Sequence, residues 1–174
     1  VDYFVLNVSC PNVSNFTKLQ DVAFLETLIP KLKEINSKKT KPKPILIKIS
    51  PDLSTDQLDE TINLVLDQNL DGIIATNTTT SRKNLNTSSF QLNKIGNGGL
   101  SGLPLTNQST EVIRYIAKKT NKKIPIIGVG GIMNENDAIE KLEAGASLLQ
   151  IYTGFIYNGP SLIKNINKKI LSCT

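Results

Sequence analysis

The sequence contains no histidine and only two cysteines among its 174 residues. Without histidine, this chain cannot supply a Ser–His or Cys–His nucleophile pair or a histidine-ligated metal. The two cysteines, Cys10 and Cys173, stand near opposite ends of the sequence. That separation does not fit a disulfide framework and favours a reducing compartment. Acid–base chemistry must therefore come from cysteine, lysine, tyrosine or a carboxylate.

Long apolar runs and a dense basic stripe are also missing. The apolar runs, such as the one from Ile124 to Val129, are a few residues long, so we expect no membrane span and no signal peptide. The net charge of +5 comes from scattered lysines without interleaved aromatic residues. This pattern predicts solvated helix faces and no nucleic-acid partner, and an anionic partner is the alternative. The chain opens without Met inside an apolar run, so we expect that the protein begins upstream of Val1, and a processed or trimmed chain is the alternative.

What the sequence does contain is an alternation of short apolar runs with longer segments of helical spacing. It predicts strands at residues 3–7, 45–49, 72–75, 124–129 and 148–152. It predicts helices at residues 23–35, 110–119, 136–144 and 161–171, and a further helix capped by Ser54. This βα order predicts a parallel sheet with right-handed crossovers.

An open doubly wound sheet and a barrel both fit that order. Polar or glycine-rich segments follow all five predicted strands, at residues 7–12, 48–52, 76–80, 128–132 and 152–155. Loops that gather at one end of a parallel sheet are typical of barrel active sites. We therefore predict an α/β fold, the C-terminal part of a (β/α)8 TIM barrel. Residues 1–174 would form one partial barrel domain of about five βα units, with the earlier units preceding Val1.

One long stretch, residues 80–102, has no clear periodicity. It is rich in Asn, Ser, Thr and Gly and ends in Gly98-Gly99-Leu100-Ser101-Gly102. A loop of this length inside a compact domain is often a lid or a ligand-binding loop, and a disordered linker is the alternative.

Two glycine turns predict a phosphate site. Residues 128–132 contain three glycines between a predicted strand and a helix, and Tyr152-Thr153-Gly154 follows the next strand. Glycine lets backbone N–H groups approach a phosphate, although tight turns also need glycine for steric reasons alone. The spacing does not match a GxxxxGK[ST] nucleotide loop.

Lys48 lies in an otherwise apolar predicted strand. A buried ammonium without a partner is costly, so this lysine must be paired or must serve chemistry as a fixed cation. The alternative is a packed stem whose charged head reaches solvent.

Amides, hydroxyls and one thiol follow two other strands. Asn7, Cys10 and Asn12 lie within six residues, and Asn77 and Thr78 follow the third predicted strand. Side-chain amides suit a planar ligand with alternating C=O and N–H groups. The thiol of Cys10 is either a tuned base or a buried structural cysteine.

Six segments of the chain, taken in order, resemble the dihydroorotate dehydrogenases, and the resemblance covers nearly the whole chain. They are Asn7-Val8-Ser9-Cys10-Pro11-Asn12, Ile47-Lys48-Ile49-Ser50-Pro51-Asp52, Ala75-Thr76-Asn77-Thr78-Thr79, Gly98-Gly99-Leu100-Ser101-Gly102, Pro125-Ile126-Ile127-Gly128-Val129-Gly130-Gly131-Ile132 and Gln150-Ile151-Tyr152-Thr153-Gly154-Phe155.

The resemblance implies an oxidoreductase of pyrimidine biosynthesis that oxidises (S)-dihydroorotate to orotate with FMN as hydride acceptor. It implies that FMN is contacted by Asn7, Lys48, Thr76, Gly102, Gly131, Tyr152 and Thr153. It also implies that the pyrimidine is held by Asn7, Asn12, Asn77 and Thr78, and that Cys10 is the catalytic base. Lys48 would stabilise negative charge on the reduced flavin.

The resemblance points in two directions for the electron acceptor. Cys10 matches soluble members that use fumarate or NAD, whereas residues 98–105, 109–114 and 155–160 resemble the quinone-linked class. The longer similarity favours a quinone. We then expect a peripheral protein on the cytoplasmic side of the membrane, which touches the membrane only through a part preceding Val1. With a soluble acceptor it would be cytoplasmic. Another FMN barrel oxidoreductase and a non-catalytic phosphate-binding fragment remain as alternatives.

The base assignment yields a first prediction. In the intact protein, Cys10→Ala should strongly slow flavin reduction by dihydroorotate while FMN stays bound, because only proton removal is lost. Stopped-flow absorbance measures this step, and an unchanged rate would remove Cys10 from the role of base. Cys10→Ser should keep part of the rate with a shifted pH optimum, since a hydroxyl titrates far above a thiol.

Overall fold

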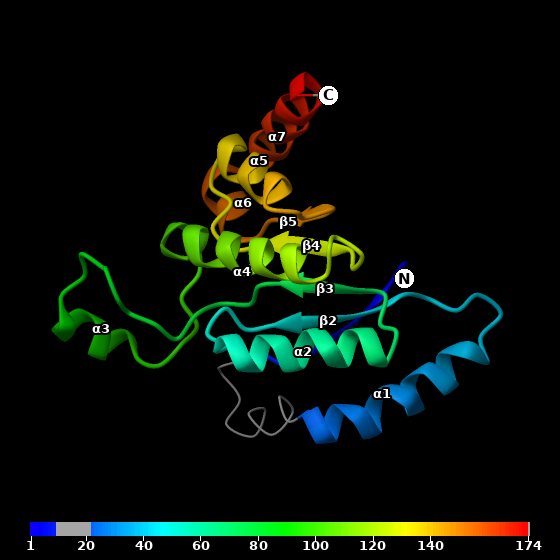
Figure 1. Ribbon diagram of the computed structural model, residues 1–174. Helices are drawn as coiled ribbons and strands as arrows, with labels where there is room; N and C mark the ends of the chain where they lie inside the picture. The colour runs from blue at the N-terminus through cyan, green and yellow to red at the C-terminus, as the bar shows by residue number, and fades with distance from the viewer. Residues whose placement is uncertain (10–21, 174) are drawn as a thin grey trace.

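A computed structural model describes residues 1–9 and 22–173 of the chain. Five parallel strands form one sheet, with helices between them (Figure 1). The strands are β1 (Phe4–Asn7), β2 (Ile45–Ile49), β3 (Gly72–Ala75), β4 (Ile126–Val129) and β5 (Leu148–Gln150). The helices are α1 (Val22–Ser37), α2 (Thr55–Asp67), α3 (Ser89–Ile95), the short 3₁₀ helix η2 (Leu103–Leu105), α4 (Thr106–Lys119), α5 (Glu135–Glu143), α6 (Thr153–Asn158) and α7 (Pro160–Cys173).

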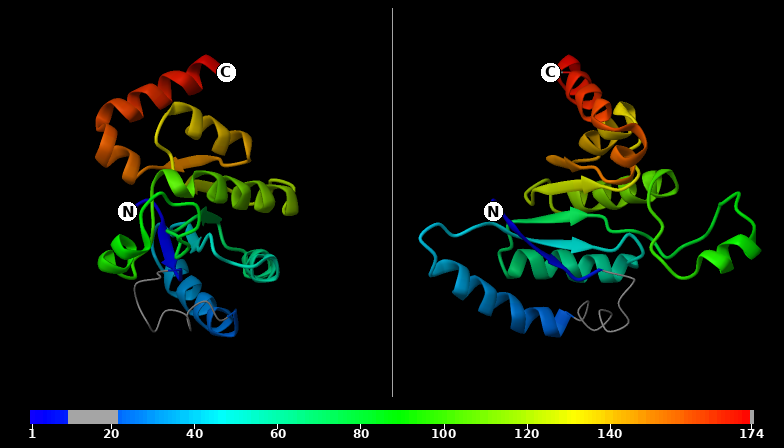
Figure 2. Two further views of the ribbon diagram at one scale, coloured as in Figure 1. Left: turned by 90° about the vertical axis from the view of Figure 1, so that its left-hand side faces the viewer. Right: turned by 180° about the vertical axis from the view of Figure 1, so that it is seen from behind.

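The order of the strands separates a barrel from a doubly wound sheet. Each strand pairs with its neighbour in the sequence, giving the order β1-β2-β3-β4-β5 without the reversal that marks a doubly wound sheet. The sheet is also curled. In a flat sheet β1 and β5 would lie about 19 Å apart, yet the side-chain amide of Gln150 donates a hydrogen bond to the hydroxyl of Tyr3 over 3.1 Å. The sheet is therefore a segment of a barrel, and the two views in Figure 2 show the helices wrapped around it.

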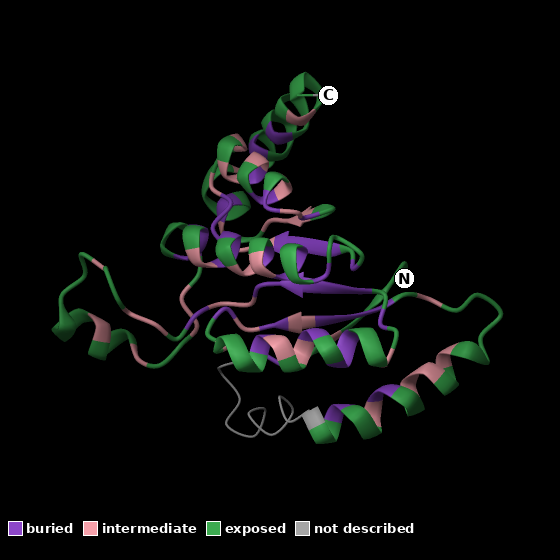
Figure 3. Ribbon diagram, in the orientation of Figure 1, coloured by how far each residue is buried: buried purple, intermediate pink, exposed green. Residues whose placement is uncertain are grey.

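Alternation along the strands divides their side chains between two faces. On the convex face, Ile45, Ile47 and Ile49 of β2 join a buried core with residues of α1, α2 and α4. On the concave face, Leu46, Ile74 and Ile127 form a second, smaller cluster. Figure 3 shows the three central strands, β2, β3 and β4, as the most buried layer and the outer surfaces of the helices as exposed. Each buried isoleucine or leucine stabilises the fold by about 1.5–3 kcal/mol.

Helix caps determine where α2 and α5 begin after the loops that precede them. Ser54 accepts a hydrogen bond from the amide of Gln57, whose side chain accepts one from the amide of Ser54, so the predicted cap is confirmed. Asn134 and Asp137 form the same capping box at the start of α5. Such a cap contributes about 1 kcal/mol. Strand β4 begins after Pro125, which has no N–H to donate and accepts from Ile73 through its carbonyl.

Residues 80–102 contain an element that the sequence did not predict. The short helix α3 lies within this stretch and projects away from the sheet (Figure 1). None of its residues is buried, and Phe90 and Ile95 are exposed, so the helix lacks the buried apolar stripe that a sequence pattern detects. A β-bridge between Thr79 and Leu100 closes the base of this stretch.

The base of residues 80–102 is held by two charged side chains. Asp52 accepts hydrogen bonds from the hydroxyl of Thr79, from the amide and hydroxyl of Thr80, and from the side-chain amide of Gln108. Arg82 donates to several backbone carbonyls, among them that of Gly98. Partial burial by itself raises the pKa of Asp52, but the hydrogen bonds outweigh it and lower that pKa.

This arrangement predicts that Asp52→Ala loosens residues 79–102 without unfolding the barrel. The amide of Thr80, which donates to Asp52 over 2.7 Å, should exchange its hydrogen about tenfold faster because a bond to a carboxylate is lost. Hydrogen-exchange mass spectrometry should show β3 and β4 unchanged, and Asp67→Ala, at an exposed position on α2, is the matched control.

The same interaction has a pH dependence of known sign. Because the pKa of Asp52 is lowered in the folded protein, the stabilisation that Asp52 gives to residues 79–102 is present above the ordinary carboxyl pKa. It is lost as the pH falls through the lowered value.

If the amide hydrogen of Thr80 exchanged equally fast in wild type and Asp52→Ala at neutral pH, Asp52 would not hold residues 79–102.

Candidate functional site

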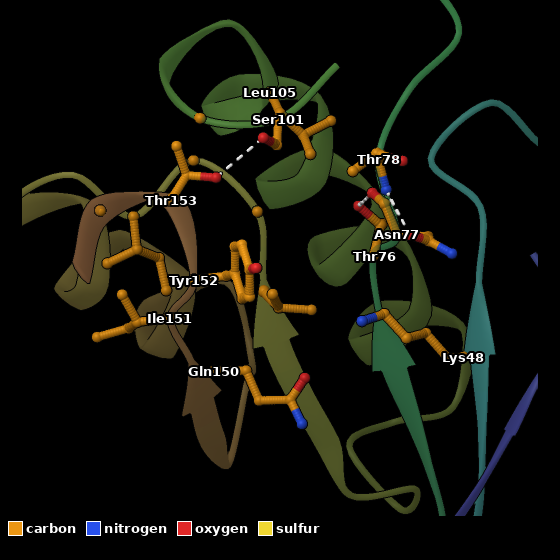
Figure 4. Close-up of a pocket in the computed structure, with 16 residues that line it drawn as sticks. Lys48, Thr76, Asn77, Thr78, Ser101, Leu105, Gln150, Ile151, Tyr152 and Thr153 are labelled. Carbon is orange, nitrogen blue, oxygen red and sulfur yellow. Dashed lines mark hydrogen bonds between the residues drawn. The ribbon is translucent and has the colours of Figure 1, made fainter. Parts of the chain in front are cut away.

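A cleft of about 530 Å³ lies at the carboxyl ends of the strands. This size is within the range of small-molecule and cofactor sites. Figure 4 shows the side chains that line it, which come from segments far apart in the sequence. Among them are Lys48 of β2, Thr76, Asn77 and Thr78 after β3, Ser101 and Gly102 before η2, Gly130 and Gly131 after β4, Gln150 of β5, and Tyr152, Thr153 and Gly154 after β5.

Lys48 supplies the positive charge of the cleft. It lies on the same concave face of β2 as Leu46, one residue from the end of the strand, and it is half-buried. Figure 4 shows Lys48 on one side of the cleft, with Gln150 and Tyr152 on the other. Within residues 1–9 and 22–173 the Lys48 ammonium has no hydrogen-bond or ion-pair partner. Burial lowers the pKa of Lys48, so its charge would gain from an anionic ligand.

Asn77 holds the polar corner of the cleft. Its side-chain amide donates to the side-chain oxygen of Asn7 over 3.3 Å and to the carbonyl and hydroxyl oxygens of Ser9 over 3.0 and 3.1 Å. Its side-chain oxygen accepts from the amide of Thr78 over 2.9 Å. Asn7 is exposed and lies beside the cleft, in contact with Asn77, without lining it. Two carboxamides and a hydroxyl are thereby brought to one corner.

Two glycines, Gly131 and Gly154, allow backbone turns to form the end of the cleft opposite the carboxamide corner. Gly131 has φ +71°, and a Cβ atom there would lie 2.4 Å from the backbone of Thr106. A Cβ atom at Gly154 would lie 2.0 Å from the carbonyl oxygen of Ile132. A side chain at Gly131 would push the turn after β4 away from the start of α4, and a side chain at Gly154 would push the turns after β4 and β5 apart. The contact between Gly154 and Ile132 brings these two turns together, an arrangement that suits binding of an anionic group by N–H donors.

Ser101 and Gln150 line the cleft but were not predicted as site residues. The hydroxyl of Thr153 donates to that of Ser101 over 2.9 Å, which ties the turn after β5 to the loop before η2 (Figure 4). Gln150 is a polar residue at the end of an otherwise apolar strand, the same signal that singled out Lys48. It could therefore have been found from the sequence.

Most residues that the sequence predicted for the site meet in this cleft. Eight of them line it, namely Lys48, Thr76, Asn77, Thr78, Gly102, Gly131, Tyr152 and Thr153. Asn7 adjoins it through Asn77. Cys10 and Asn12 lie outside the described residues. The individual roles of all these residues stay predictions.

Two features are absent from the described part of the chain. No cluster of three or more His, Cys, Asp or Glu side chains there could hold a metal ion. Within residues 1–9 and 22–173, no helix combines the length and the apolar character needed to cross a lipid bilayer.

Comparison with known proteins agrees with the fold. The family model described as dihydroorotate dehydrogenase matches residues 1–173. A curated relative from Christiangramia forsetii, named dihydroorotate dehydrogenase (quinone), is 57% identical over 98% of this chain and 49% of its own length. A relative of the same name from Crocosphaera subtropica is 49% identical over 98% of this chain and 45% of its own length. The chain thus spans about half the length of the curated relatives it matches.

Solved structures give the same result for the fold. A ligand-free DHODH from Eimeria tenella matches with a TM-score of 0.90 at 31% identity, over 99% of this chain and 52% of that chain. A second structure from that organism, in complex with ferulenol, has a TM-score of 0.89. Together with the sequential order of the parallel strands, this similarity confirms the predicted α/β barrel segment. The chain belongs to the dihydroorotate dehydrogenase family.

Proposed function

We propose that the intact protein oxidises (S)-dihydroorotate to orotate in pyrimidine biosynthesis, with FMN as its cofactor. The observation that carries this proposal is the convergence of a cation, a carboxamide corner and two glycine turns in one cleft. Separately, each feature has a structural explanation. Together they suit a ligand pair with a phosphate, a flat ring system that gains negative charge, and a second planar ring rich in C=O and N–H groups.

The cleft fits a flavin mononucleotide. Membership of the family implies a flavin in general. The close approach of the turns at Gly131 and Gly154 supports placing the phosphate there, beside the backbone of Tyr152 and Thr153. Thr76, Gly102 and Lys48 would flank the ring system at the strand ends. When bound, FMN supplies the capacity to accept the two electrons that leave the substrate.

The carboxamide corner would orient the substrate. Asn77 and Thr78, with Asn7 beside them, bring donors and acceptors to one corner, which would align a pyrimidine for reaction. Cys10 and Asn12 enter the proposal through their sequence motif alone, Cys10 as the base that removes a proton from the substrate and Asn12 as a further pyrimidine contact. The half-buried ammonium of Lys48 would stabilise negative charge that develops at the ring system, without reorganisation during the reaction.

For the electron acceptor the proposal is a quinone. Relatives at 57% and 49% identity are named quinone-dependent enzymes. A quinone is lipid-soluble, so the protein would work peripherally at the membrane, on its cytoplasmic side. Cys10 favours the competing possibility, a soluble acceptor such as fumarate or NAD, because cysteine at this motif position resembles the soluble members.

A single set of measurements on the purified intact protein tests the function. The protein should carry bound FMN, orotate should perturb the flavin absorbance, and dihydroorotate should bleach it under anaerobic conditions. A ubiquinone analogue should then restore the absorbance faster than fumarate or NAD does. A flavin that orotate and dihydroorotate leave unchanged would indicate a different oxidoreductase, and faster recovery with fumarate or NAD would assign the soluble class.

Lys48 offers a sharper prediction about the chemistry. Lys48→Met keeps the length of the side chain and removes its charge, so the rate of flavin bleaching by dihydroorotate should fall by about 100-fold or more. Stopped-flow absorbance at saturating dihydroorotate measures this rate.

Lys41→Met is the matched control, because Lys41 is exposed in the loop before β2, at the other end of that strand. The control should bleach at the wild-type rate. Equal rates in Lys48→Met and wild type would mean that the charge of Lys48 does not take part.

A further inference from the structure

Lys141 is a completely buried lysine behind the glycine turn that follows β4, at Gly130 and Gly131. It lies on α5, its exposed fraction is 0%, and it does not line the cleft. The sequence motifs of the family did not single it out, and the proposed reaction does not use it. A lysine that is fully buried in a protein interior requires an explanation, because removing an ammonium from water is costly.

The hydrogen bonds of Lys141 have the pattern of a charged ammonium. Its Nζ atom donates to the hydroxyl oxygens of Ser109 and Thr110, each over 2.8 Å, and to the carbonyl oxygen of Thr106 over 3.2 Å. These three acceptors match the three protons of an ammonium, whereas a neutral amine has only two. Although burial lowers the pKa of Lys141 to about 8, against the opposing attraction of Asp137 and Glu140, the ammonium remains the major form at neutral pH.

The positive charge of Lys141 has no direct counterion in the described part of the chain. No carboxylate there forms an ion pair with it. Asp137, on the same helix, accepts instead from the amides of Met133 and Asn134 in the capping box of α5. Charged groups buried without a counterion are rare in stable proteins, so this cation is suited to an anion that is not part of the chain.

Two of the three partners of Lys141 touch the glycine turn directly. The hydroxyl oxygen of Ser109 lies 2.8 Å from the carbonyl oxygen of Gly130, a distance at which it can donate a hydrogen bond. The hydroxyl of Thr106 donates to the carbonyl oxygen of Gly131 over 2.6 Å. Ser109 has a single proton, and it could also donate to the carbonyl of Thr106 over 3.1 Å. The shorter distance favours the carbonyl of Gly130 as the acceptor of this proton. The ammonium therefore lies two hydrogen bonds from the turn.

We infer that Lys141 is a positioning residue for the phosphate end of the cleft, where it clamps the first turn of α4 onto Gly130 and Gly131 and places a positive charge behind them. This inference rests on the proposed function, since the anion is taken to be the phosphate of FMN. It makes Lys141 a determinant of the preference for FMN over riboflavin, the same flavin without phosphate. The charge acts through the turn and does not touch the ligand.

The test compares the two flavins on apoprotein prepared from the intact enzyme. Lys141→Met keeps the apolar stem and removes the charge. Its affinity for FMN should fall by about tenfold or more, while that for riboflavin changes by less than about twofold. Quenching of flavin fluorescence on binding measures both constants. Lys118→Met, on the exposed face at the end of α4, is the control for loss of one positive charge and should keep the wild-type ratio.

Ser109→Ala provides a second variant that keeps the buried charge and cuts its link to Gly130. It should lower the preference for FMN by a smaller factor, about threefold. If Lys141→Met does not fold, as judged by circular dichroism, the ratio for Ser109→Ala decides.

The outcomes separate this inference from the proposed function. Affinities for FMN and riboflavin that fall in parallel, or a wild-type ratio in both variants, would reduce Lys141 to a packing role and overturn the inference while the function stands. A wild-type apoprotein that binds neither flavin would overturn the proposed function and this inference together.

Discussion

The alternation of side chains along short parallel strands is the constraint on which the cleft depends. Within β2 the isoleucines at positions 45, 47 and 49 pack against helices, and this forces Leu46 and Lys48 onto the concave face. A shift of register by one residue would exchange the two sets, burying the ammonium under the helices. Because the sheet is curled, the concave face at the strand ends becomes a cleft, and Lys48 points into it from a rigid element.

A positive charge lies near each end of the cleft. Lys48 stands in its wall and Lys141 behind its glycine turn, and neither forms an ion pair with the residues that the structure describes. The fully buried ammonium of Lys141 costs the fold an amount on the order of several kcal/mol, and that of the half-buried Lys48 costs less. An anionic ligand would offset part of that cost, so ligand binding and stability are coupled through the same charges. Hydroxyl and carbonyl oxygens accept the three hydrogen bonds of Lys141.

The sequence determined the elements of the barrel and most of the cleft. Short β-branched runs flanked by turns and helix caps can be recognised from the sequence of each segment alone. Polar residues at the ends of apolar strands can also be recognised, because their neighbours are apolar. Lys48, Asn77 and Gly131 could be predicted for this reason, because strand ends meet at one edge of a parallel sheet. Gln150 carries the same signal.

Only the tertiary structure decided the contacts that join distant segments. The helix α3 buries no residue, so no pattern marks it. The helix α6 begins within residues 152–155, which the sequence predicted only as a loop after the last strand. Lys141 in Glu140-Lys141-Leu142 has the appearance of a solvated helix residue. Its burial follows from the packing of α5 beside α4, where Thr106, Ser109 and Thr110 satisfy its three protons. Local sequence propensity cannot predict these contacts, because the residues that accept the hydrogen bonds of Lys141 lie more than thirty positions away in the sequence.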